Sequence, residues 1–444
     1  MLTNGIHLDR LAVAFNITGS ISLSPFLNPD RILPMKIRSI TCFVNPQYPL
    51  KVRSLKAAGD FISMARPAFE QAGYEVQSTR LATIPFPGLL PELAAVELAR
   101  LAQELERASA DLGYGYLSMG PALPELPESF GLIPEALAAT QNTFFSALMT
   151  TDRGMVSLPA VRSCAQVIQQ ASQISADGFA NLRFAALANV PAGSPFFPAA
   201  YHQGEKPSFA LATEAADLAL TAFDCASSLQ EGRDNLIRAV EAHAQVLTDV
   251  GWALEGRSGV KFAGIDFSPA PFPAKELSVG TALERLGVQG FGSQGSLAAT
   301  AILADTIDRA KFSRAGFSGV MLPVLEDAVL AERVREGALG ITDLLLYSAV
   351  CGTGLDTIPL PGDTSVEALS AILLDVSALA LRLDKPLTAR LMPIPGKSAG
   401  DLTGFDFAYF ANSRVLPVRA SPLGELLSGD ESFDLNRYER HESI

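Results

Sequence analysis

Basic charge is scarce in this sequence, and its scarcity excludes one large class of partner. Lysine and arginine residues number 34, against 47 aspartate and glutamate residues, which gives a net charge of -13. A nucleic-acid-binding surface needs a basic stripe or patch, and the chain carries none. We therefore expect no nucleic-acid partner and interpret the acidic surface as a source of solubility.

Soft metal ligands are also few. The four cysteines form no Cys-x-x-Cys pair and lie far apart, at Cys42, Cys164, Cys225 and Cys351. Only His202 and His243 lie in the body of the chain. Zinc-site spacing and a three-histidine metal site are therefore excluded. Isolated thiols in a long chain favour a reducing cytoplasm.

No apolar run reaches the roughly 18–20 residues that cross a bilayer, so we expect no membrane partner. The first 34 residues also lack the charged start and apolar stretch of a signal peptide. A strand pattern begins directly at Met35-Lys36-Ile37, which resembles a natural start. We predict that residues 1–34 are a poorly ordered extension that results from an upstream start-codon assignment.

Apolar residues, in contrast, make up 48% of the chain and charged residues only 18%, which indicates a large core. Strand-like and helix-like segments alternate, as is typical of crossover connections and a sheet buried on both faces. The expected strands are Ile37–Asn45, Tyr74–Leu81, Gly115–Met119, Leu182–Asn189, Ser208–Leu211, Val260–Phe267, Gly319–Pro323, Leu355–Leu360 and Thr388–Ile394. The expected helices are Ser54–Gln71, Pro91–Ala108, Ile133–Leu148, Ala160–Ile174, Glu214–Ser228, Arg233–Ala253, Val279–Leu286, Leu297–Ala310, Asp327–Glu336 and Ser365–Leu383. No linker interrupts the alternation, so we predict one α/β domain over residues 35–420 and a frayed polar tail over 421–444.

Five carboxylates follow expected strands, in turns rich in glycine and proline: Asp266, Glu326, Asp327, Asp356 and Asp363. If the strands are parallel, their carboxyl-terminal ends share one face and the carboxylates converge. Converging carboxylates repel, which raises a pKa for acid–base work or recruits Mg²⁺ or Ca²⁺. The alternative for each is that it caps its own turn. We predict a divalent-cation site at Glu326, Asp327 and Asp363, and catalytic roles for Asp266 and Asp356.

Four further side chains are candidates for chemistry. His202 ends a rigid proline- and aromatic-rich segment and is expected to transfer a proton or contact an anion, although a loop histidine can also simply be solvated. Cys351 precedes Gly-Thr-Gly and is either a projecting nucleophile or a buried, inert thiol. Lys397 follows a Pro-Gly turn, and we expect it and Arg390 to hold an anionic substrate, with a solvated lysine as the alternative.

The segment Gly290-Phe291-Gly292-Ser293-Gln294-Gly295 matches a dinucleotide fingerprint, but a helix instead of a strand precedes it. We therefore expect no NAD. Gly292 and Gly295 are predicted to shape a turn whose free N–H groups open the next helix and hold an anionic substrate.

Long stretches of the chain resemble the uncharacterised bacterial and archaeal family known as domain of unknown function 711, which is related in fold to pyruvate formate-lyase. They are Asn181–Phe184, Pro195–His202 with Thr213-Glu214, Gly264–Asp266, Pro323–Asp327, Gly354–Thr364 and Pro393–Gly400. The resemblance implies a ten-stranded α/β barrel of two five-stranded halves, with Cys351 on a loop inside it. It implies no glycyl radical, because Pro417 stands where the radical enzymes have glycine. Gln294 also departs from the histidine expected there, which weakens a metal or proton-transfer role at that turn.

We therefore expect a non-radical cytoplasmic enzyme that acts on a small anionic metabolite. The resemblance also implies a small amino-acid-sensing partner protein and hence an amino-acid-linked role, and we expect a homo-oligomer. The alternative is a binding or regulatory protein that kept the fold and lost catalysis.

Overall fold

The structure is a computed structural model and describes residues 35–50 and 52–437. The extension predicted for residues 1–34 lies outside the described residues, as does the end of the predicted tail. The described residues belong to one compact unit that begins at Met35.

Nine strands of the described chain form one mixed sheet. They are β1 (Lys36–Val44), β2 (Thr79–Thr83), β3 (Tyr116–Ala122), β4 (Thr143–Leu148), β6 (Phe184–Ala188), β7 (Ser208–Glu214), β8 (Lys261–Asp266), β9 (Gly354–Pro361) and β10 (Leu387–Ile394). Their order across the sheet is β8-β7-β1-β2-β3-β4-β6-β10-β9. The predicted α/β class is confirmed.

The strands run in two opposed directions, and this decides where the site forms. β1, β2, β3, β4 and β6 are parallel to one another. β7 and β8 are antiparallel to β1, while β9 and β10 are antiparallel to β6. The carboxyl ends of β7 to β10 therefore lie at the same end of the sheet as the amino ends of the first group.

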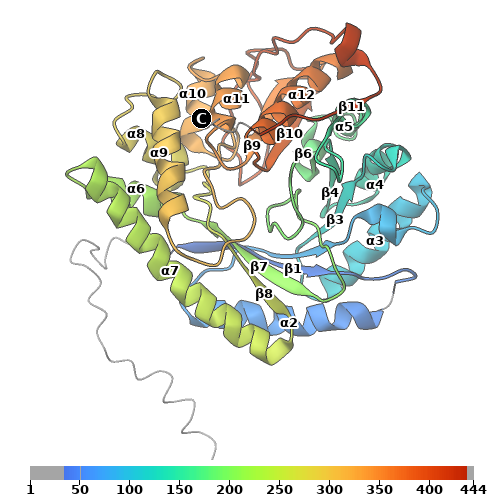
Figure 1. Cartoon of the computed structure of the whole chain (residues 1–444), viewed down its shortest axis with the longest axis horizontal. Helices are drawn as coiled ribbons and strands as arrows, with labels where there is room; N and C mark the ends of the chain where they lie inside the picture. Colours follow the sequence, from blue (N-terminus) through green and yellow to red (C-terminus); the bar gives the residue numbers. More distant parts are fainter. Residues whose placement is uncertain (1–34, 51, 438–444) are drawn as a thin grey trace, which may run out of the picture. The chain divides into compact units, whose positions relative to one another are not determined.

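Helices cover the outer face of this curved sheet (Figure 1). They are α2 (Val52–Gln71), α3 (Ala95–Asp111), α4 (Ile133–Ala139), α5 (Leu158–Ser172), α6 (Ala216–Asp224), α7 (Leu229–Ser258), α8 (Val279–Arg285), α9 (Ser296–Arg309), α10 (Ala328–Arg335), α11 (Ile341–Ser348) and α12 (Val366–Arg382). α2 packs on β1, α7 on β8, and α5 and α12 on β10. Every residue of β9 and β10 is buried, as expected for strands covered on both faces.

A loop between β6 and β7 covers part of the inner face. Thr41 Oγ1 donates to the Pro195 carbonyl at 3.3 Å, and Ser118 Oγ donates to the Ala200 carbonyl at 2.7 Å. The His202 N–H donates to the Thr83 carbonyl at 2.8 Å. These bonds fix residues 195–202 across β1, β2 and β3, so the proline- and aromatic-rich segment forms one wall of the interior.

The predicted ten-stranded barrel is not confirmed, because the sheet is not closed between β8 and β9. The intervening chain forms only isolated bridges, Ile265 with Arg314 and Pro323 with Asp356. The predicted strand Gly319–Pro323 therefore has no ladder. Directly before this segment, the Asp266 carboxylate accepts the Phe317 and Ser318 N–H groups at 2.9 and 2.8 Å. A strand would offer such groups to a neighbouring strand.

One expected helix, Ile133–Leu148, was wrong over its second half. The helix ends at Ala139, and Thr143–Leu148 forms β4 in the middle of the sheet. The run Thr143-Phe144-Phe145 has the branched and aromatic side chains that fit a pleated sheet better than a helix.

In the tail, Ser432–Phe433 (β11) pairs with Val156–Ser157 (β5), and Arg162 donates to the Gly429 carbonyl at 2.7 Å.

The glycine-rich turn between α8 and α9 lies away from the inner face. Gly292 has φ +104°, and its N–H donates to Ser296 Oγ at 2.9 Å. A Cβ atom at Gly292 would lie 2.3 Å from the Ala338 carbonyl oxygen. The turn needs glycine at this position for backbone geometry and close packing.

Replacing Gly292 with alanine should therefore destabilise the fold. Left-handed geometry and the forced contact with Ala338 each cost about 1–3 kcal/mol. We expect a loss of roughly 3 kcal/mol or more in the free energy of unfolding, measured by urea denaturation. Gly290→Ala is the matched control, because its Cβ would approach only Arg333 Nε at 3.9 Å. Equal effects in the two variants would contradict this account.

Candidate active site

Three arginines from three strands meet on the inner face at one end of the sheet. Arg38 lies in β1, Arg80 in β2 and Arg390 in β10. β1 and β2 begin at this end, while β10 runs toward it from the opposite direction. The reversal between the two groups of strands therefore places these side chains together.

Glu326, directly before α10, joins two of these arginines. Its Oε1 accepts from Arg390 Nη2 at 2.8 Å, and its Oε2 accepts from Arg38 Nη2. Arg390 Nε also donates to Asp356 Oδ1 at 2.6 Å. The side chains of Arg390, Glu326 and Asp356 are 5%, 8% and 1% exposed. Solvent therefore screens these ion pairs little.

Burial and arginine charge act in opposite directions on the two carboxylates. Burial raises the pKa of Glu326, but the charges of Arg390, Arg38 and Arg80 outweigh it and leave the pKa below its usual value. For Asp356, burial dominates over the charge of Arg390, and the pKa stays above its usual value. Glu326 is thus the firmly ionised member and Asp356 the one that accepts a proton more readily.

Arg38 is held from a second side. Its Nη1 donates to the Pro271 carbonyl at 3.0 Å and lies 3.5 Å from Glu214 Oε2. Glu214, the last residue of β7, also accepts from Gln77 Nε2 at 2.7 Å. The guanidinium of Arg38 therefore has its donors directed at Glu214, Glu326 and a carbonyl.

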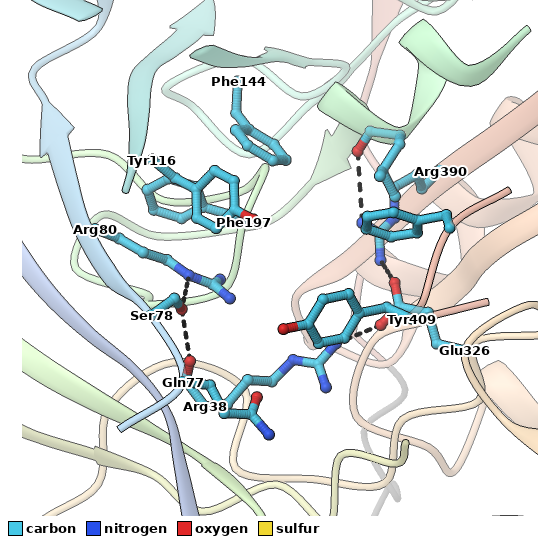
Figure 2. A pocket seen from close by; sticks show the side chains of 12 residues that line it. Arg38, Gln77, Ser78, Arg80, Tyr116, Phe144, Phe197, Glu326, Arg390 and Tyr409 are labelled. Atoms are coloured by element: carbon cyan, nitrogen blue, oxygen red, sulfur yellow. Dashed lines mark hydrogen bonds and ion pairs between the residues drawn. The ribbon is translucent and has the colours of Figure 1, made fainter. Parts of the chain in front are cut away.

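Arg80 differs from the other two arginines because no described carboxylate lies within ion-pair distance of it. Its Nε donates to Ser78 Oγ at 3.0 Å, and its guanidinium lies 5.1 Å from the centre of the Phe197 ring. Burial, followed by the charge of Arg38, lowers the pKa of Arg80 to about 9. Figure 2 shows its guanidinium pointing into the pocket. Arg80 is thus a charged side chain without an anionic partner among the described residues.

These side chains line a pocket of about 110 Å³. Its charged part is formed by Arg38, Arg80, Glu326 and Arg390. Its remaining walls are mainly aromatic, from Tyr116, Phe144, Phe197, Phe407 and Tyr409 (Figure 2). Apolar walls with a few converging polar groups are typical of sites for small organic ligands.

A smaller cavity of about 20 Å³ lies on the other side of Arg38, Arg80 and Glu326. Asp266 and Asp356 both line it. This volume admits one water molecule, and the polar lining offers it partners. The structure thus brings Glu326, Asp356 and Asp266 around one small cavity, as the sequence predicts for several of the carboxylates.

Asp266, however, is occupied by its own turn. Its carboxylate accepts from Ser268 Oγ at 2.5 Å and from the N–H groups of Phe317 and Ser318. Burial raises its pKa, and these three hydrogen bonds lower it in part. This contact pattern is that of a carboxylate that shapes a loop, which was the alternative reading of each acidic turn.

The three residues predicted to hold a cation do not converge. Asp327 caps α8 and α10, because its carboxylate accepts from the N–H groups of Val279, Val329 and Leu330. Glu326 points instead to the arginines, and Asp363 is exposed in the turn before α12. Within residues 35–50 and 52–437, no three His, Cys, Asp or Glu side chains are placed to share a metal ion. The geometry of the predicted cation site is therefore corrected.

His202 and Cys351 lie outside the pocket lining. The His202 ring stacks on Phe43 at 6.4 Å, near the opposite end of β1. Phe43 is about 16 Å along the strand from Arg38. Burial lowers the pKa of His202, and its Nε2 is buried without a described partner. Cys351 is a buried free thiol in the loop before β9.

Of the residues predicted to contact a substrate, only one lines the pocket. Arg390 lines the pocket, whereas Lys397 sits in the turn after β10, and Gly292 and Gly295 lie in the α8–α9 turn. No lining residue of the pocket comes from those turns.

The sequence reasoning missed Arg38 and Arg80, together with Glu214. Each arginine interrupts an apolar strand pattern, in Lys36-Ile37-Arg38-Ser39-Ile40 and in Thr79-Arg80-Leu81. A charge inside a buried strand is costly, so this interruption was the available signal.

Comparison with known proteins gives a family and no activity. The sequence profile of the family described as "Uncharacterised ACR (DUF711)" matches residues 32–412. A UPF0210 protein of Pyrobaculum arsenaticum is 33% identical over 87% of this chain and 90% of its own length. UPF0210 proteins of Acetivibrio thermocellus and Methanosarcina mazei are each 29% identical, over 79% and 93% of this chain and 81% and 91% of their own lengths. The helices within the described ranges are all too short or too polar to cross a membrane.

Asp327→Ala should show that this carboxylate is structural. Its loss leaves buried N–H donors at two helix starts without an acceptor, and such groups cost about 1–3 kcal/mol each. We expect the free energy of unfolding to fall by at least about 2 kcal/mol in urea denaturation. Asp363→Ala is the control and should change stability by less than about 0.5 kcal/mol, because it is exposed. A cation-dependent stability that both variants abolish would instead restore the predicted metal site.

Arg390→Met should test the buried ion pairs. Removing the shared cation leaves Glu326 and Asp356 buried without it, which costs about 3–5 kcal/mol at pH 7.5. The pKa of Asp356, which is already above its usual value, then rises further, and that of Glu326 rises as well although Arg38 and Arg80 remain. Protonation of Asp356 therefore favours the folded state, and the loss should shrink toward pH 4.5. Urea denaturation at both pH values measures this.

The control is Arg66→Met, which breaks an exposed pair with Glu70 and should cost less than about 1 kcal/mol at either pH. A loss in Arg390→Met that stays constant with pH would mean that lost packing, and not the carboxylate charge, causes it.

Proposed function

We propose that this chain, which belongs to the uncharacterised DUF711 family, binds a small organic monoanion in the pocket between Arg80 and Arg390. Arg80 supplies the countercharge and forms a forked pair with a carboxylate. The observation that carries the proposal is the lack of a carboxylate partner for Arg80 among the described residues.

The other charges around the pocket support this assignment. Glu326 is shared by Arg38 and Arg390, and Asp356 is paired with Arg390. Since these carboxylates are already engaged, an incoming anion does not have to displace them from Arg80. Arg80 is half-buried, so its lack of a partner costs less than it would for a fully buried cation, and a bound carboxylate removes that cost.

The ligand is small and singly charged. Among the charged donors that line this pocket of about 110 Å³, Arg38 and Arg390 are already paired with carboxylates, and Arg80 is not. A phosphate dianion needs several charge-assisted donors, whereas one guanidinium satisfies one carboxylate. We therefore favour a monocarboxylate, which agrees with the small anionic metabolite expected from the sequence.

Non-radical catalysis is the second candidate, and the environment of Asp356 favours it. Its pKa is raised, it contacts Arg390, and it lines the small cavity beside the pocket. A water molecule there is suited to carry a proton between Asp356 and a ligand at Arg38 or Arg80. In this proposal the arginines replace the divalent cation expected at Glu326, Asp327 and Asp363.

We also propose that the sheet is an incomplete barrel related to that of pyruvate formate-lyase. Residues 314–323 lie between its two edges and bridge to Ile265 on β8 and Asp356 on β9. The opposed directions of β1 to β6 and β7 to β10 support a construction from two halves. A cytoplasmic location, a homo-oligomer and an amino-acid-sensing partner stay predictions from the sequence.

Arg80→Met should bind no monocarboxylate and yet be at least as stable as the parent protein. Methionine keeps apolar packing against Phe197 and removes a half-buried, unpaired charge, so we expect the stability without ligand to be unchanged or to rise by up to about 1 kcal/mol. Thermal-shift and calorimetric titrations with small monocarboxylates and their neutral amides measure binding, and urea denaturation measures stability. The parent protein should bind the acids at least tenfold more tightly than the amides.

Arg66→Met, on the outer helix α2, is the control and should bind as the parent protein does. Amides that bind as tightly as acids, or binding that survives in Arg80→Met, would overturn the proposed function.

A further inference from the structure

Resting on this proposed function, we infer that the monoanion carries one flat aromatic ring, held between two facing aromatic walls. The chemical class is thus a single-ring aromatic carboxylate, such as a benzoate or a nitrogen-containing analogue. The walls come from opposite parts of the chain and are built separately (Figure 2).

The first wall is a rigid aromatic cluster on the sheet. Phe144 of β4 meets Tyr116 of β3 edge-on at 5.6 Å and meets Phe197 at 5.3 Å. Phe197 is fixed in the loop of residues 195–202, and the Arg80 guanidinium lies over its ring. The carboxylate partner and the ring contact are therefore parts of one preorganised surface.

The second wall is the tip of a loop that spans residues 402–414. Leu402 and Arg414 form an antiparallel bridge at its base, and Asn412 Oδ1 accepts from the Phe405 N–H at 2.9 Å. Phe407 and Tyr409 lie at the tip, with ring centres 5.3 Å apart. Both line the pocket, and Figure 2 shows Tyr409 across the pocket from Tyr116 and Phe197.

The side of this tip that faces away from the pocket packs against other residues, so the tip is ordered without a ligand. Phe410 packs edge-on against Phe407 at 5.2 Å, and Phe179 packs against Phe407 at 5.1 Å. The Ala411 N–H donates to the Leu325 carbonyl at 2.7 Å, which ties the loop to the residue before Glu326. Ring contacts made with such a wall require little ordering on binding.

The volume fits one ring and excludes a larger system. An apolar cavity of roughly 150 Å³ holds benzene. This pocket of about 110 Å³ is smaller but partly open to solvent beside Tyr409, so a ring that lies between the walls with its carboxylate at Arg80 would reach into the open mouth. A fused two-ring acid would have to project through the mouth.

Two tyrosine hydroxyl groups at the pocket favour a ring that carries a hydrogen-bonding substituent or a ring nitrogen. The hydroxyls of Tyr116 and Tyr409 make no hydrogen bond to any residue that the structure describes, and both residues line the pocket. Each can donate to, or accept from, a substituent or a ring nitrogen. A hydroxybenzoate or a pyridinecarboxylate should therefore bind more tightly than benzoate itself.

Isothermal titration calorimetry of the full chain tests the ring. Benzoate is compared with cyclohexanecarboxylate, which has the same charge and similar size but is not flat, and with benzamide, which is flat and uncharged. We expect benzoate to bind about tenfold more tightly than cyclohexanecarboxylate, because aromatic pairs favour flat partners, and at least tenfold more tightly than benzamide. Phe407→Leu, which keeps an apolar side chain, should remove most of the preference for benzoate over cyclohexanecarboxylate.

The outcomes separate the two proposals. Phe312→Leu, which changes an aromatic residue outside the pocket, should keep that preference. Equal affinity for benzoate and cyclohexanecarboxylate, both lost in Arg80→Met, would overturn the aromatic ring and leave the anion site standing. Binding of neither acid, or of benzamide as tightly as benzoate, would overturn the anion site itself.

Discussion

The paired contacts of Arg390 with Glu326 and Asp356 tie together elements that the chain forms far apart. Arg390 comes from β10, Asp356 from β9, and Glu326 from the connection into α10. Through its second oxygen Glu326 also reaches Arg38 on β1, at the other side of the open sheet. Because all but Arg38 are nearly inaccessible to solvent, loss of one member leaves another charge buried. This chain of charges fixes the distance across the interior and therefore the shape of the pocket.

The carboxylates in the acidic turns around this interior have two kinds of partner. Asp266 and Asp327 direct their oxygens at backbone N–H groups, and so stabilise a loop and two helix starts. Glu326, although it is the neighbour of Asp327 in the sequence, directs its oxygens at arginines. Adjacent carboxylates therefore serve opposite purposes, and only the partner supplied by the fold tells them apart.

Local pattern was enough to predict the α/β class, most elements and the approach of some of the acidic turns to one another, which Asp266, Glu326 and Asp356 show around the small cavity. It failed where non-local contacts decide the structure of a segment. Residues Thr143–Leu148 continue a helix pattern in the sequence, but they pair with neighbouring strands as β4. It also failed for strand direction. The expected convergence depended on parallel strands, which would place candidate side chains only at strand ends. The antiparallel halves instead bring the starts of β1 and β2, with Arg38 and Arg80, to the ends of β7 to β10.

Arg80 is the place where stability and binding oppose each other. The fold neutralises Arg38 and Arg390 with carboxylates but leaves Arg80 with a hydroxyl and an aromatic ring. A neighbouring aspartate would make the empty protein more stable, yet an incoming anion would then have to displace it. In the proposed function the missing charge comes from outside, so that binding would recover a cost already present in the folded protein. The aromatic side chains around the pocket would act in the same direction, since they reduce the access of water to that charge.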